Sequence, residues 1–169
     1  METWIAIDSQ SAVDGLMDAF DGFHDACLRE ASIAGETYVN EQRGMHCPGH
    51  LETSVVMSFQ SQGSSNRAIE IFCKGVSLFR IAPTPDGCDS ILGAALVSRE
   101  GALWRFCLSF VGAPLTGRPN TFIDVTYDPR RAPDIEVAAI SIFWRVTVSL
   151  GSGLRYRPDS LLNGGPLIQ

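Results

Sequence analysis

The first apolar positions of the chain repeat at helical spacing. Six of them fall near an i, i+3, i+4 pattern, and they are Ala12, Val13, Leu16, Met17, Ala19 and Phe20. Asp8, Ser9 or Ser11 can cap the first turn, and Gly22 can end the helix. Because a helix of about three turns is marginal alone in water, we expect this one to pack against the rest of the protein.

From His24 onward the pattern changes to a period of two, which is typical of strands. Strands are expected at 24–32, 38–39, 51–60, 68–81, 91–97, 103–110, 122–127 and 135–150. Gly75 interrupts the fourth of these and predicts a bulge. The spacing around Arg99-Glu100-Gly101 predicts a hairpin, and 63–66 and 112–120 are expected to be a turn and a surface loop.

These elements predict a mainly β protein, for which α+β is also a defensible label. We expect an antiparallel β-sandwich or a partly open barrel of about eight strands with one short N-terminal helix. Residues 1–150 would form a single β-rich domain. Residues 151–169 are rich in glycine and proline and would dock on that domain or on a neighbouring subunit, which allows a homodimer.

Composition favours a globular protein of the cytoplasm. The apolar fraction is 45%, no apolar run reaches the roughly 18 residues that span a bilayer, and the first residues carry acid rather than the basic start of a signal peptide. The five cysteines form no CxxC pair, so we expect reduced thiols, with Cys73 and Cys107 in the core.

Charge is distributed unevenly along the chain. The net charge is −6, and residues 1–41 hold nine acids against one base, Arg29. An acidic protein without a basic stripe is a poor binder of nucleic acid. The acidic N-terminal face can serve solubility or can meet a basic surface on another protein.

All three histidines lie between residues 24 and 50. Imidazole and thiolate groups suit zinc, so His24, His46, Cys47 and His50 are the candidate metal ligands. Adjacent His46 and Cys47 do not readily point at one ion, and no second paired ligand motif is present. An ordinary loop is therefore the favoured interpretation, and no cofactor is expected.

The candidate binding or structural site is the corner where the helix leads into the first strand. It comprises Phe23, His24 and Asp25, with Glu30 further along that strand. A regular strand would place His24, Ala26, Leu28 and Glu30 on one face, with His24 and Glu30 about 20 Å apart. We interpret Phe23 as a core anchor, and His24 and Asp25 as groups that tie down the turn.

Several motifs, taken in order, resemble a family of small uncharacterised bacterial proteins. They are FHDACLREASIAGETYVNEQRGM from Phe23, FQSQ at 59–62, IEIFCKGVSLFRIAP at 69–83, EGALWR at 100–105 and AAISIFWR at 138–145. The resemblance covers roughly residues 20–145 and implies a compact, intracellular β-rich domain. It carries no activity, and it is immunity-like only by analogy.

Two functions therefore remain. The first is a non-enzymatic, protein-binding and immunity-like protein that uses its acidic face or an exposed strand edge. It is favoured because the chain has no GxSxG elbow, phosphate loop or other catalytic signature. The alternative is a small enzyme or metal-dependent ligand-binding protein with its site near the N-terminal histidines.

Overall fold

The computed structural model describes residues 3–47, 51–82, 91–110 and 134–147. The one α-helix in these ranges, α1 (Gln10–Ala19), is followed by a 3-10 turn, η1 (Asp21–Phe23). Seven strands form one antiparallel sheet in the order β1-β9-β6-β5-β2-β7-β8. They are β1 (Ile5–Ala6), β2 (Ala26–Ala34), β5 (Ser54–Ser61), β6 (Ala68–Ile81), β7 (Ile91–Glu100), β8 (Leu103–Phe110) and β9 (Ile135–Val146). Two further strands, β3 (Tyr38–Val39) and β4 (Met45–His46), pair with each other in a separate small sheet.

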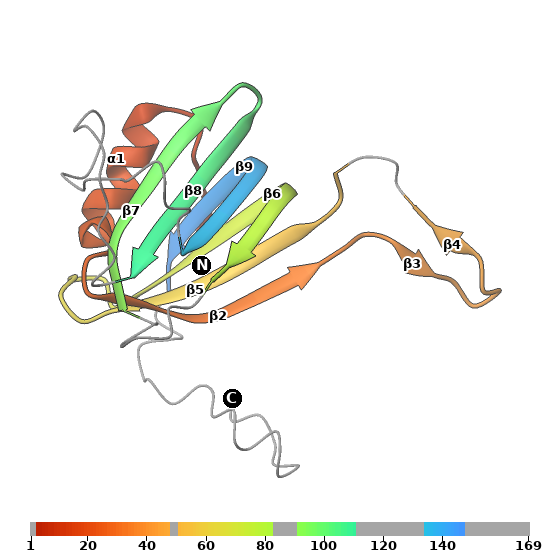
Figure 1. Cartoon of the computed structure of the whole chain (residues 1–169), viewed down its shortest axis with the longest axis horizontal. Coiled ribbons are helices and arrows are strands. Elements are labelled where there is room, and N and C mark those ends of the chain that lie inside the picture. The colour runs from red at the N-terminus through yellow and green to blue at the C-terminus, as the bar shows by residue number, and fades with distance from the viewer. Residues whose placement is uncertain (1–2, 48–50, 83–90, 111–133, 148–169) are drawn as a thin grey trace, which may run out of the picture.

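The large sheet is strongly curled but is not closed into a barrel. β8 pairs with β9 as well as with β7, which bends the sheet back on itself. Along the other seam, β2 meets β7 at only two residue pairs, Ala26 with Leu92 and Cys27 with Ile91. The predictions of a mainly β, antiparallel fold and of one short N-terminal helix are confirmed, and the partly open barrel is the nearer of the two architectures (Figure 1).

The helix packs on the sheet through its apolar stripe. Val13, Leu16 and Met17 are buried, and the side chain of Ser9 accepts a hydrogen bond from the backbone N–H of Ala12 at 3.3 Å, so Ser9 is the N-cap. Below the helix, four fully buried phenylalanines pack edge to face: Phe20, Phe23, Phe59 and Phe106. This aromatic cluster joins the helix, the turn after it, β5 and β8 in one core.

β6 and β9 form the longest ladder and carry a bulge where the sequence pattern predicted one. The register shifts between Val76 and Leu78, and Gly75 lies in the left-handed region with φ of +66°. A Cβ at Gly75 would approach Cδ1 of Ile140 to 2.8 Å, so both the backbone and the space favour glycine. The bulge sharpens the bend of the sheet at this point.

Two buried carboxylates on the outer face of this ladder are neutralised by arginines from β8 and β9. Glu70 receives a hydrogen bond of 2.7 Å from Nε of Arg145, and Arg105 pairs with Glu136. Arg145 also lies over the ring of Trp4, 4.4 Å from its centroid. Because both glutamates are paired, burying them does not leave an uncompensated charge.

Several details differ from the sequence prediction. β2 begins at Ala26 and not at His24, because Asp25 has a φ of +54° and cannot continue a strand. A second register shift between Leu28 and Glu30 breaks the regular alternation, so the expectation that His24, Ala26, Leu28 and Glu30 share one face is wrong.

The short strands β1 and β4 were not anticipated. The strand expected at 122–127 and the extension at 151–169 lie outside the described residues.

Within the described ranges, no helix is long and apolar enough to cross a bilayer.

Gly75→Ala is expected to lower the free energy of unfolding by about 2 kcal/mol, because the left-handed conformation and the contact with Ile140 both oppose a Cβ. Gly101→Ala is the matched control, since Gly101 has a φ of +61° with nothing within 4 Å of the added atom. Urea unfolding of both variants should give a smaller loss for Gly101→Ala. Equal losses would contradict a role for the packing of Ile140 over Gly75.

Candidate functional site

The most prominent feature of the molecule is a β-arm that projects from the body. β2 and β5 pair from Ala26 with Ser61 to Ala34 with Ser54, and the chain between them continues beyond the sheet. We define the arm as residues 32–53, of which 48–50 lie outside the described residues. Figure 1 shows the arm reaching away from the body on the side opposite to α1, with β3 and β4 near its tip.

The arm exposes apolar side chains to a degree that the body does not. Every residue from 32 to 47 is exposed. Five of the nine exposed large apolar side chains among the described residues lie on the arm, and they are Ile33, Tyr38, Val39, Met45 and Leu51. Met45 is 71% exposed and Val39 is 60% exposed. Scattered exposed apolar residues are ordinary, but a concentration on one projection indicates an interaction surface.

The tip of the arm is nevertheless a well-defined hairpin. The backbone N–H of Asn40 bonds to the carbonyl of Gly44, and the side-chain Oδ1 of Asn40 accepts from the N–H of Gly44 at 2.8 Å. Arg43 adopts a φ of +63° to close the turn. The rings of Tyr38 and His46 lie 5.0 Å apart across the two strands. Local bonds therefore give the arm a definite shape without burying its apolar groups.

The second feature is the corner between α1 and β2, where the backbone is unusually strained. Asp21, Phe23 and Asp25 all have left-handed φ values, of 48°, 66° and 54°. Gly22 between them has a φ of 58°. Non-glycine residues rarely adopt this conformation, and such clusters persist only where the surroundings hold them. Here the burial of Phe23 in the aromatic cluster holds the corner.

An open pocket of about 480 Å³ lies beside this corner. Its lining comes from the start of β2, the end of β5 and the turn after β5: Asp25, Ala26, Cys27, Gln60, Ser61, Gln62 and Arg67. The backbone N–H of Gln62 bonds to the carbonyl of Asp25 at 3.2 Å, which fixes the two sides of the pocket together. We call this the corner pocket.

The turn that forms one wall of the corner pocket is tied to the helix. Ser64 Oγ and Asn66 Nδ2 both donate to the carbonyl of Ala19, at 3.1 and 2.8 Å. These bonds satisfy a carbonyl at the end of α1 that has no partner within the helix. The Oγ of Ser61 accepts from the N–H groups of Gly63 and Ser64 and stabilises the turn.

The corner pocket offers groups that can bind a polar ligand. It combines one carboxylate, one guanidinium, two side-chain amides and the thiol of half-buried Cys27. Nδ1 of His24 lies 3.1 Å from Oδ2 of Asp25, but both side chains are more than half exposed. Because both groups of this imidazole–carboxylate pair are exposed to water, the pair contributes little to the stability of the fold.

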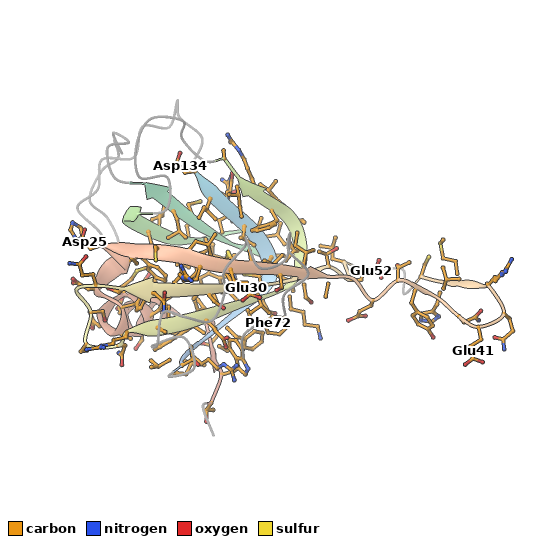
Figure 2. All side chains as sticks on the ribbon, turned by 90° about the horizontal axis from the view of Figure 1, so that it is seen from below. Asp25, Glu30, Glu41, Glu52, Phe72 and Asp134 are labelled. Atoms are coloured by element: carbon orange, nitrogen blue, oxygen red, sulfur yellow. The ribbon has the colours of Figure 1, made fainter. Side chains whose placement is uncertain are left out.

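The candidate metal ligands within the described ranges do not converge on one site. His24 lies at the corner, next to Asp25, whereas His46 and Cys47 lie on the arm. Figure 2 shows Asp25 and the arm residue Glu41 at opposite ends of the molecule. His50 lies outside the described residues, and the described ones contain no group of three His, Cys, Asp or Glu side chains placed to hold a metal. Zinc binding by the set of His24, His46, Cys47 and His50 stays a prediction.

Glu30 and the other N-terminal acids are also separated. Glu30 lies on β2 between the corner and the arm, where it accepts a hydrogen bond from Ser32 at 3.4 Å (Figure 2). Asp14 and Asp18 are on α1, while Glu36 and Glu41 are on the arm. The described acids of residues 1–41 are thus spread from α1 along β2 to the arm.

The sequence pattern did not predict that Cys27, Gln60, Gln62 and Arg67 would line a pocket with Asp25. A signal was nevertheless present, because two of the motifs that carry the family resemblance meet here. The end of FHDAC and most of FQSQ lie on the neighbouring strands β2 and β5, with Cys27 opposite Gln60. The rings of Phe23 and Phe59 are 5.2 Å apart. Their separation of more than thirty residues in the chain hid this contact.

The buried thiols of Cys73 and Cys107 are unsuited to act as nucleophiles. Burial raises the pKa of the Cys73 thiol to about 12, and burial, with Glu136 nearby, raises the pKa of the Cys107 thiol to about 12. Both remain protonated at neutral pH, which fits the predicted core role. Cys27 and the exposed Cys47 are the more accessible thiols among the described residues.

Comparison of the chain with family models, curated proteins and solved structures found no match. The resemblance to uncharacterised bacterial proteins therefore stays a prediction.

Asp25→Ala is expected to lower the free energy of unfolding by about 1 kcal/mol, because alanine tolerates the left-handed conformation less well than aspartate. Asp25→Gly is the control. It removes the same carboxylate but suits a φ of +54°, so its stability should stay close to that of the native chain. Equal losses for the two variants in urea unfolding would instead assign the effect to the contact between Asp25 and His24.

Proposed function

We propose that this chain is a protein-binding module that engages its partner through the arm and has no catalytic role. The proposal depends above all on one observation: the arm carries five of the nine exposed large apolar side chains among the described residues. Large apolar residues gathered on a projection are what an interface core requires.

The free energy gained by burying apolar side chains favours association of the arm with a partner over its exposure to water. Burying a large apolar side chain yields roughly 1.5–3 kcal/mol, so covering even part of the arm would supply a large share of a binding free energy. The local turn already fixes the hairpin, and a preorganised surface loses less conformational entropy when it binds. The arm is therefore suited to dock as a unit.

The strand edges of the arm offer a second means of recognition. Among the described residues, β3 pairs only with β4, so the outer edges of this small sheet have backbone groups available for a further strand. Addition of a strand supplies main-chain hydrogen bonds, and the flanking side chains of Tyr38, Val39 and Met45 would add selectivity.

A second candidate function is the binding of a small polar ligand in the corner pocket. The coincidence of a strained backbone with a pocket supports it, since strain of this kind gathers at binding and catalytic sites. A carboxylate and a guanidinium in the lining of one pocket would suit a ligand that carries both charges. This function is compatible with the first, because the pocket and the arm are at opposite ends of β2 and β5.

A photo-cross-linking amino acid at Tyr38 is expected to give a discrete cross-linked product with a protein in cells of the native host. The same probe at Ile5 is the control, because Ile5 is an exposed apolar residue of the body. Val39→Glu and Met45→Glu together should remove the product, since they place charge in the proposed interface core. If the product forms equally at Ile5, or survives the double substitution, the arm is not the binding surface.

A further inference from the structure

We propose that the partner of the arm is a second copy of this chain, with the arm of each protomer docked on the outer face of β6 and β9 of the other. The inference rests on the proposed function and specifies its partner. It is carried by a second exposed apolar surface on the same chain, whose charge is opposite to that of the arm.

The receiving surface is formed by residues around and beyond the Gly75 bulge. We define the β6–β9 face by Lys74, Leu78, Arg80 and Ile140, all of which are exposed. Leu78 is 39% exposed and Ile140 is 51% exposed. Register places Leu78 opposite Ala138, so Leu78 and Ile140 are diagonal neighbours across the two strands.

The two surfaces are complementary in charge as well as in hydrophobicity. The arm has three glutamates, Glu36, Glu41 and Glu52, against one arginine, Arg43, which gives it a net negative charge. The β6–β9 face contributes Lys74 and Arg80.

One acid that lies beside that face in the ladder is already neutralised. Glu136 lies opposite Arg80 in the register, but it is buried and paired with Arg105. Within the described ranges, neither Lys74 nor Arg80 takes part in an ion pair. Their positive charge is therefore available for the glutamates of another protomer, and complementary charges of this kind set the register of an interface.

The positions of the two surfaces suit a twofold axis. The β6–β9 face lies at the base of the arm, because Lys74 is opposite Ser54 and the N–H of Val76 bonds to the carbonyl of Thr53 at 2.8 Å. The apolar residues of β3 and β4 lie towards the tip, away from the body (Figure 1). Two arms running antiparallel would therefore bring each tip to the base of the other arm.

A twofold pairing also makes each contact twice. The same arm-to-face contact would occur in both directions, as it does in any isologous dimer. Doubling the contact matters because a stable interface needs roughly 800 Å² from each partner. Two arm-to-face contacts bury twice the area of one.

The test uses the native chain and two charge-reversed variants. The face variant carries Lys74→Glu and Arg80→Glu, and the arm variant carries Glu36→Lys and Glu41→Lys. In either variant alone, both contacts of the dimer would oppose like charges. In a mixture of the two, both contacts of the mixed dimer would again join opposite charges.

Sedimentation equilibrium of the native chain should give twice the chain mass of 18.3 kDa. Each variant alone should dissociate at a concentration about tenfold or more higher, and an equimolar mixture should recover the dimer. The control is Asp14→Lys with Asp18→Lys, which changes the net charge as the arm variant does but on α1. This control should dimerise like the native chain.

Three outcomes would overturn the inference. They are a monomeric native chain over the whole accessible range, a mixture that recovers no dimer, or a dimer that persists in both variants and is lost when residues 151–169 are removed. The last would assign the interface to the C-terminal extension. If the native chain is monomeric while the Tyr38 probe still cross-links a different protein, the inference fails and the proposed function stands. If the probe also captures nothing, both fail.

Discussion

The pairing of β2 with β5 is the constraint on which the rest of the structure depends. One end of this ladder, at Ala26 and Ser61, is built into the body and forms the corner pocket. The other end, at Ala34 and Ser54, leaves the sheet and supports the arm. Because the hydrogen-bonded register is continuous apart from the shift near Leu28, a slip of one residue would disturb both sites at once.

The two ends of this ladder differ in how they are stabilised. At the corner, left-handed residues are held in place because Phe23 is fully buried against three other phenylalanines. The burial of one aromatic side chain is worth several times the cost of one such conformation. At the arm no comparable core exists, and short-range bonds around Asn40 maintain the hairpin. Stability is thus concentrated at the corner, and accessible apolar surface is concentrated at the arm.

The sequence pattern was most informative where one local rule decided the structure. It predicted α1, the Gly75 bulge, the hairpin at Gly101 and the burial of Cys73 and Cys107, each of which depends on neighbouring residues. It did not predict the start of β2, because the conformation of Asp25 is imposed by the packing of Phe23. The corner pocket depends on the contact of β2 with a distant strand, which a single sequence does not reveal.

The arm shows most clearly why exposure cannot be read from the pattern alone. Tyr38, Val39 and Met45 are residues that also occur in buried strands, and the sequence pattern favoured an ordinary loop that contains histidines for the second pair, Met45-His46. What distinguishes them is that no element of the same chain packs against them among the described residues. Local alternation specifies that a face is apolar, but only the tertiary arrangement specifies whether it meets a core or remains open for another molecule. The exposed apolar side chains of the hairpin, which the described part of the fold leaves uncovered, are therefore what supports the proposal of association.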